Sequence, residues 1–197
     1  MAKSDTKQRL IDAAMDLFST KGYDGTSVDE IAEYIGIKGP TIYKYFKGKE
    51  ALLEALMNQA DEEYDKGVIV ASKEAESITT SDEFKTFALQ SLMVPLENPT
   101  IQKMRKLFTI EQYRSETFAQ KATIHQLNNV RDMYAKIFKR LMNAGIMLQG
   151  NPSIVALEFT APNTVMIQLY DREPNKKAEV LSIFEEHVNS FIDRYFL

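Results

Sequence analysis

The stretch TSVDEIAEYIGIKGPTIYKYF, residues 26–46, predicts two short helices joined by a tight turn. Ser27 is followed three residues later by Glu30, the spacing of a capping box in which each side chain satisfies a backbone N–H group near the other. Gly36 is the residue type best able to end the first helix in a left-handed turn. Pro40 suits the first turn of the second helix, where its missing N–H group is not needed. The second helix therefore starts within about four residues of the end of the first, which is the pattern of a helix-turn-helix.

The second of these helices has one apolar side and one polar side. At about 100° per residue, Ile42 and Phe46 point in nearly the same direction and are predicted to be buried. The residues that point away from them are Pro40, Thr41, Tyr43 and Lys44, with Tyr45 on the flank. A hydroxyl, a phenol and an ammonium on one side suit a DNA groove lined by phosphates and base edges.

Positive charge is concentrated around this helix although the chain as a whole is acidic. The 197 residues carry a formal net charge of −4, while the first carboxylate after Glu33 is that of Glu50. The lysines in between are Lys38, Lys44, Lys47 and Lys49. Such a patch can attract phosphates even on an acidic protein. The alternative is a solvated basic turn, but the cap, the turn glycine, the proline and the inward apolar pair together favour a DNA-reading surface.

The segment from about residue 5 to 56 resembles the DNA-binding domain of the tetracycline-repressor (TetR) family. A preceding helix ends near Gly22 after possible caps at Ser4 and Asp5, and its apolar stripe is Leu10, Ile11, Ala14, Leu17 and Phe18. The resemblance rests on the order of short motifs: KGY from residue 21, TSV from 26, IA from 31, TIY from 41 and YFKGKE from 45. It covers about the first quarter of the chain.

The resemblance implies a set of DNA contacts. Ser27 would cap its helix and contact a phosphate, and Lys49 would meet a phosphate from the start of the next helix. The residues implied in or beside the major groove are Thr41, Tyr43, Lys44 and Tyr45, with Lys38, Gly39 and Pro40 where the recognition helix begins. Asp29 departs from the family pattern, in which some members carry a basic or neutral residue, and an acid there repels phosphate.

The rest of the chain also reads as helices, so the expected fold is all-α. Helical patterns cover residues 49–67, 81–95, 98–113, 116–143, 151–172 and 176 onward. We expect an N-terminal three-helix helix-turn-helix DNA-binding domain over residues 1–48. Residues 49–197 are expected to form a helical domain for effector binding and dimerisation.

Two apolar stripes near the C-terminus indicate a helical interface. One is Leu181, Phe184, Val188, Phe191 and Tyr195, at spacings of 3, 4, 3 and 4. The other is Ile154, Leu157, Ala161 and Val165. Each stripe could cover only its own core. We favour a homodimer because a helix-turn-helix reader generally uses two copies on two half-sites, about 34–36 Å apart, and because the family usually dimerises through its last two helices.

The resemblance also implies a small-molecule pocket within the second domain. Three polar residues fall on otherwise apolar stripes and are the candidate effector contacts: Ser91, Glu111 and Thr123. A buried polar group without a partner costs about 1–3 kcal/mol, and a ligand could supply that partner. Each could instead bond within its own helix, to Arg114 or to water. His125 is expected to be exposed, because it lies far from Leu127 on the helical wheel.

Other functional classes find little support in the composition. There is no cysteine, and there are only two histidines, His125 and His187. Neither histidine fits a Glu-x-x-His motif. We therefore expect no metal site, cofactor or catalysis. No apolar run approaches the ~20 residues of a membrane span, and no signal peptide is evident, which predicts a cytoplasmic protein. The expected function is a dimeric regulator, most simply a repressor released from its DNA operator by a small molecule. A DNA-bound architectural or partner-recruiting protein without an effector is the alternative.

Overall fold

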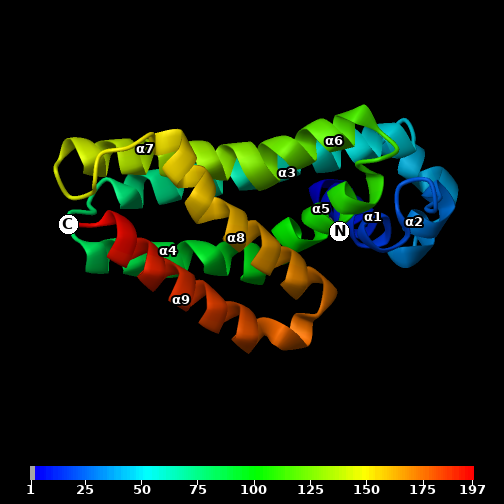
Figure 1. Ribbon diagram of the computed structural model, residues 1–197. Coiled ribbons are helices and arrows are strands. Elements are labelled where there is room, and N and C mark those ends of the chain that lie inside the picture. The colour runs from blue at the N-terminus through cyan, green and yellow to red at the C-terminus, as the bar shows by residue number, and fades with distance from the viewer. Residues whose placement is uncertain (1–2) are drawn as a thin grey trace. The chain divides into compact units, whose positions relative to one another are not determined.

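A computed structural model describes residues 3–197, and helices account for most of this range (Figure 1). The elements are, in order, α1 Lys3–Lys21, α2 Val28–Tyr34, η1 Gly39–Lys44, α3 Lys49–Ala75, α4 Ser81–Glu97, α5 Pro99–Glu111, α6 Glu116–Thr123, η2 Ile124–Asn128, α7 Asn129–Asn143, α8 Pro152–Arg172, η3 Pro174–Lys176 and α9 Lys177–Tyr195. Within residues 3–197 there is no strand, and an isolated bridge joins Met147 to Phe196. The all-α prediction with an N-terminal helix-turn-helix is confirmed.

The chain packs into two compact units. The N-terminal unit comprises the chain up to Tyr64 together with Pro99–Ala122, and the C-terminal unit comprises Asp65–Asn98 with Thr123–Leu197. Helix α3 therefore passes from one unit into the other, and α5 belongs to the N-terminal unit although α4 does not. The division predicted at residue 48 concerns function rather than packing, and it stays a prediction.

The N-terminal unit is built around α1, which packs against both α2 and α5. Its apolar stripe is buried as predicted at Leu10, Ala14 and Phe18. Ser4 and Asp5 lie in the first turn of α1 rather than ahead of it, because the helix begins at Lys3. Burial of this stripe fixes the helices on which the candidate DNA-binding residues are mounted.

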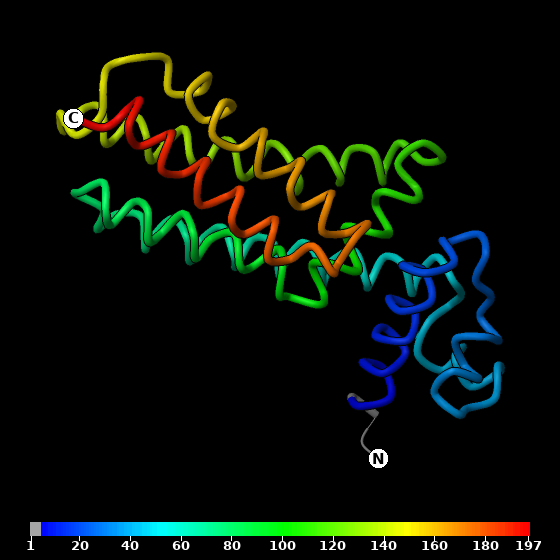
Figure 2. The backbone as a smooth tube through the Cα atoms, turned by 60° about the horizontal axis from the view of Figure 1, so that its bottom comes forward, coloured from blue at the N-terminus to red at the C-terminus, as the bar shows by residue number. Residues whose placement is uncertain are grey.

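The C-terminal unit is a bundle of α4, α7, α8 and α9, and the course of these helices can be followed in Figure 2. Aromatic rings fill its core. The ring centroids of Phe84 and Phe159 are 5.4 Å apart, and those of Phe159 and Phe191 are 4.7 Å apart. Rings at 4.5–7 Å attract each other beyond their burial. The centre of this unit is therefore occupied by its own side chains.

Two helices end later than their sequence patterns suggest. Helix α4 runs through Pro95 to Glu97, and α3 continues to Ala75. A proline removes one backbone hydrogen bond. That loss does not end α4, because the next residue, Leu96, is buried in the core of the C-terminal unit.

A π-helical turn, η2, interrupts the long helix expected over residues 116–143. The backbone N–H group of Asn129 donates to the carbonyl of Ile124, five residues earlier. Such a turn inserts one residue into the α-helical pattern and rotates the side chains on its two sides relative to each other. His125 is consequently only 6% exposed while Leu127 is 49% exposed, so the prediction of an exposed His125 was wrong.

The apolar stripe of α9 lies inside the subunit rather than on an interface. Phe184, Val188 and Phe191 are at most 4% exposed, and Leu181 and Tyr195 pack against the same core. Side chains that are already buried have no area left for a partner subunit. The prediction that Phe184, Val188 and Phe191 form a dimer interface was therefore wrong: the 3–4 spacing identified a buried face, and the chain's own helices cover it.

The stripe of α8 is different, because it remains uncovered. Ile154, Leu157 and Val165 are 51%, 49% and 57% exposed, and Ala161 lies between them and is also exposed. These four residues, here called the α8 stripe, are still available to a partner.

Replacing both Phe184 and Phe191 with aspartate should unfold the C-terminal unit rather than merely separate subunits. Each substitution places an unpaired charge in an apolar core, at a cost of several kcal/mol per ion. Thermal unfolding followed by circular dichroism measures the effect. Ser182→Asp with Ser190→Asp, on exposed positions of α9, is the matched control and should keep the melting temperature. A double phenylalanine variant that stays fully folded would contradict the core assignment.

Candidate nucleic-acid interface

The N-terminus of α2 is fixed by the predicted capping box. The Ser27 hydroxyl accepts a hydrogen bond from the Glu30 N–H group at 3.1 Å, and the Glu30 carboxylate accepts one from the Ser27 N–H group at 2.9 Å. The Lys21 ammonium also donates to Glu30 at 2.8 Å. That hydrogen bond, followed by the one from the Ser27 backbone, lowers the pKa of Glu30 to about 2. The cap is therefore formed with an ionised carboxylate.

The turn after α2 has the geometry that Gly36 predicts. Gly36 adopts φ of +74°, and its N–H group donates to the Glu33 carbonyl at 2.9 Å. The Ile37 N–H group donates to the Ala32 carbonyl, also at 2.9 Å, which completes a Schellman motif. Arg9 of α1 donates to the Ile35 carbonyl at 2.9 Å. The direction in which the chain leaves α2 is thus held from two sides.

The recognition helix, η1, is a 3₁₀-helix rather than an α-helix. Ile42 is fully buried and Phe46, just beyond the helix, is 6% exposed, as the wheel predicted. Tyr43 is 62% exposed and Lys44 is exposed beside it. Because residues three apart eclipse each other in a 3₁₀-helix, Tyr45 turns toward the side of Ile42 and is half-buried. The side chains most available to a groove are therefore Tyr43 and Lys44, with Thr41 half-exposed.

Gly39 leaves room for the Asp29 side chain where the recognition helix begins. A Cβ atom added at this position would lie 1.9 Å from the Asp29 carboxylate oxygen. Real Cβ atoms do not approach an oxygen so closely, so any larger residue would displace Asp29 or the helix. Asp29 itself is exposed in the first turn of α2, where a negative charge suits the helix dipole.

Three of the four lysines of the basic patch are free to meet phosphates. Lys38, Lys44 and Lys47 are exposed and make no ion pair or hydrogen bond within residues 3–197. Lys49 differs, because its ammonium donates to the carbonyls of Tyr23 and Thr26 at 2.8 and 3.0 Å. It also lies 4.3 Å from the centre of the Tyr23 ring, a cation–π contact. The structure thus gives Lys49 a role in holding the α1–α2 loop, and its phosphate contact stays a prediction.

The same loop is held from the other side by Glu111. Its carboxylate accepts a hydrogen bond from the Tyr23 N–H group at 2.9 Å and lies 3.8 Å from the Arg114 guanidinium. Burial raises the pKa of the Tyr23 hydroxyl, and Glu50 and Asp24 raise it further. Glu111 is thus a buried residue with partners in its own unit. Its carboxylate already has partners in the loop and in Arg114, and its predicted role as an effector contact stays a prediction.

The other two predicted effector residues belong to the C-terminal unit, whereas Glu111 belongs to the N-terminal unit. Ser91 lies on α4 in the C-terminal unit, half-buried, with its hydroxyl hydrogen-bonded to that of Tyr134. Thr123 is exposed at the end of α6. Their predicted effector contacts stay predictions. Within residues 3–197 no group of three or more acidic, histidine or cysteine side chains could hold a metal ion, and no helix is long and apolar enough to cross a membrane.

Sequence reasoning missed the residues that connect distant segments. Arg9 reaches a carbonyl 26 residues away, and Glu111 reaches an N–H group 88 residues away. No spacing rule pairs such positions. The only signal for Glu111 was its place on an apolar face, which correctly indicated burial.

The comparisons with known proteins agree with this geometry. Residues 10–56 match the profile of the bacterial regulatory proteins of the tetR family. The biofilm operon icaADBC HTH-type negative transcriptional regulator IcaR of Staphylococcus aureus (strain Newman) is 46% identical over 48 residues, which are 24% of this chain and 26% of IcaR. The chain spans less than half the length of the curated relatives it matches.

Solved structures match over the full length. The crystal structure of a Mesorhizobium loti MAFF303099 protein assigned to the TetR-family transcriptional regulators has a TM-score of 0.73 at 24% identity, covering 100% of both chains. SmeT of Stenotrophomonas maltophilia, in its complex with triclosan, has a TM-score of 0.69 at 16% identity and covers 98% of this chain and 92% of that one. At these identities the likeness establishes the fold.

The chain is thus an all-helical protein whose N-terminal unit carries a complete helix-turn-helix. Residues 10–56 match the tetR-family model of bacterial regulatory proteins, and the whole chain has the fold of the solved TetR-family structures.

Tyr43→Ala and Lys44→Ala should each weaken binding to the operator while leaving the melting temperature nearly unchanged, because both side chains point away from the core. Phe46→Ala should lower stability by about 3–5 kcal/mol, since it truncates a buried aromatic. Gel-shift titration and thermal unfolding separate the two effects. Unfolding caused by Lys44→Ala would contradict the orientation of η1.

Lys49→Ala should lower stability by about 1–3 kcal/mol, because it removes the side-chain donor of the Thr26 carbonyl and one of the two donors of the Tyr23 carbonyl. Lys47→Ala is the matched control on the other side of Gly48 and should change stability by less than about 0.5 kcal/mol. Chemical denaturation measures both. Equal stability of the two variants would show that Lys49 does not hold the loop.

Proposed function

We propose that the protein is a DNA-binding transcriptional regulator that represses its target by occupying an operator. The observation that carries the proposal is the exposed pair Tyr43 and Lys44 on a helix whose opposite side is anchored by Ile42 and Phe46. A fixed helix with outward hydroxyl and ammonium groups suits base edges and phosphates of the major groove. The description of IcaR as a negative regulator supports repression rather than activation.

Binding to a full operator would require two copies of the chain. The α8 stripe supports a homodimer, because it offers exposed apolar side chains on successive turns of one helix. A two-fold partner presenting the same stripe would remove this surface from water in both subunits. The recognition helices of such a dimer would read half-sites about 34–36 Å apart.

Sequencing the genomic DNA fragments that the protein retains tests the regulatory role directly. Purified protein is mixed with sheared DNA of its source genome, and the retained fragments are sequenced. A shared inverted repeat near promoters is the expected result, with affinity that falls steeply as salt rises. Retention without any common sequence would contradict operator recognition and would favour an architectural DNA-binding protein.

We further propose that a small molecule releases the protein from its operator. Asn163 on α8 is only 9% exposed. Its side-chain carbonyl oxygen has no hydrogen-bond partner within residues 3–197. A buried acceptor of this kind costs about 1–3 kcal/mol unless a donor reaches it. A ligand with an O–H or N–H group among the aromatic rings of the C-terminal unit would supply that donor. SmeT, which has the same fold, is known in complex with triclosan.

The effector-independent alternative also has an observation in its favour, which is the tight aromatic packing around Phe159. Asn163→Leu separates the two possibilities. In a protein without an effector, the variant should be more stable by about 1–3 kcal/mol and should repress normally, because an unsatisfied carbonyl has been removed. In a sensor, it should abolish the rise in melting temperature that a phenolic ligand such as triclosan causes.

Substitutions in the α8 stripe test the proposed dimer. Leu157→Asp combined with Val165→Asp should give a folded monomer that loses tight binding to the full operator, because two linked half-site contacts become one. The fold should survive since both side chains are about half exposed in the subunit. Analytical ultracentrifugation measures the mass. A variant that remains dimeric would place the interface elsewhere.

A further inference from the structure

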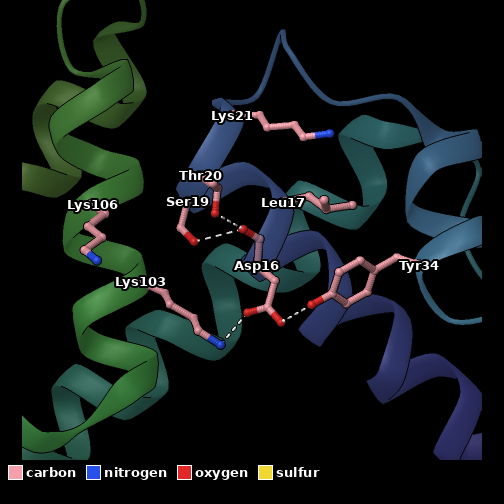
Figure 3. A pocket seen from close by; sticks show the side chains of 8 residues that line it. All are labelled: Asp16, Leu17, Ser19, Thr20, Lys21, Tyr34, Lys103 and Lys106. Atoms are coloured by element: carbon pink, nitrogen blue, oxygen red, sulfur yellow. Dashed lines mark hydrogen bonds and ion pairs between the residues drawn. The ribbon is translucent and has the colours of Figure 1, made fainter.

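An open pocket of about 610 Å³ lies within the N-terminal unit, where α1, α2 and α5 meet (Figure 3). Its lining is almost entirely polar: Asp16, Leu17, Ser19, Thr20, Lys21, Tyr34, Lys103 and Lys106. None of these residues belongs to the predicted DNA-binding or effector set. The pocket is therefore unexplained by the function proposed above.

The lining carries more positive than negative charge. The lining includes three lysines and a single carboxylate, that of Asp16. Lys103 pairs with Asp16, and Lys21 pairs with Glu30 of the capping box at 2.8 Å. Lys106 is exposed and makes no ion pair or hydrogen bond within residues 3–197. In Figure 3 the Lys103 ammonium reaches from α5 to Asp16 on α1, while the Lys106 side chain lies along α5.

The hydroxyl groups of the lining already donate their hydrogens. Ser19 and Thr20 donate to the Asp16 backbone carbonyl at 3.2 and 2.7 Å, and the Tyr34 hydroxyl donates to the Asp16 carboxylate at 3.2 Å. Each hydroxyl oxygen keeps lone pairs that can accept a hydrogen bond. The pocket thus offers cationic donors on α5 and acceptor oxygens on α1.

We infer that this pocket binds a small hydroxylated oxyanion, such as a phosphate monoester or a hydroxycarboxylate. Its charged group would lie between Lys103 and Lys106, since charge-assisted hydrogen bonds to an oxyanion are the strongest available in the lining. Its hydroxyl groups would donate to Ser19 and Thr20. A neutral sugar would leave Lys106 without an anion, and an anion without hydroxyl groups would leave the acceptor oxygens of α1 unused.

Such a ligand would act on the helix-turn-helix through Asp16. This carboxylate now joins Lys103 of α5 to Tyr34 in the last turn of α2. An oxyanion competing for Lys103 releases Asp16 from that ion pair while the Tyr34 contact remains. Ligand binding would thereby change how α2 is tied to α5 within the N-terminal unit.

Isothermal titration of the full chain with glycerol 3-phosphate, malate and inorganic phosphate at constant ionic strength tests the site without any DNA. Glycerol 3-phosphate or malate should bind saturably and at least tenfold more tightly than inorganic phosphate, and the tighter of the two identifies the charged group. Lys106→Gln should weaken that binding at least tenfold. Because this side chain is exposed and makes no ion pair or hydrogen bond within residues 3–197, the variant should keep its fold, and an unchanged melting temperature verifies this. The absence of saturable binding by both organic anions would overturn the inference.

The DNA-reading lysines provide the matched control, because they could also bind phosphate. Lys44→Gln with Lys47→Gln should leave the affinity for the organic anion unchanged. If this control loses the binding and Lys106→Gln keeps it, the anion occupies the DNA-binding surface and the pocket assignment is wrong. Equal affinity of inorganic phosphate and the hydroxylated anions would likewise overturn the role of Ser19 and Thr20.

Discussion

A helix of six residues cannot persist in water by itself, and this constraint governs the N-terminal unit. Helix nucleation fixes several residues for one hydrogen bond, so η1 depends on the burial of Ile42 and on that of Phe46 just beyond its end. Those two side chains can be buried only if α1 and α2 present a fixed surface. The capping box at Ser27 and the Schellman motif at Gly36 supply the two ends of α2. The outward direction of Tyr43 and Lys44 is therefore a consequence of packing on the other side of the helix.

The loop between α1 and α2 is fixed by charges from opposite sides. The Lys49 ammonium binds two of its carbonyls, and the Glu111 carboxylate binds the N–H group of Tyr23. Because the loop backbone offers both donors and acceptors, one cation and one anion can satisfy it without meeting each other. The Glu111 contact also joins α5 to the N-terminal unit, although α4, which precedes α5 in the chain, belongs to the C-terminal unit. A helix distant in sequence thereby stabilises the segment that leads into α2.

Local signals in the sequence predicted the local structure well. The capping box, the left-handed glycine and the inward pair Ile42 and Phe46 each depend on residues within a few positions of one another, and each appears as expected. What depends on distant partners could not be predicted in the same way. Glu111 was recognised as a polar residue on a buried face, but its partner lies 88 residues away. The π-turn at η2 had no local signal, and its one extra residue reversed the expected exposure of His125 and Leu127.

The two C-terminal stripes show where helical periodicity ceases to be informative. Residues at spacings of 3 and 4 define one face of a helix, and a face of this kind is apolar whether its own chain or a second copy covers it. On α9 the covering side chains are the rings of Phe84, Phe138 and Phe159, so the stripe is core. On α8 the opposite side of the helix supplies Phe159 to that core, which leaves Leu157 and Val165 facing water. A helix that is apolar on two sides has one side more than its own subunit uses. The proposed dimer surface on α8 rests on this exposed second side rather than on the spacing.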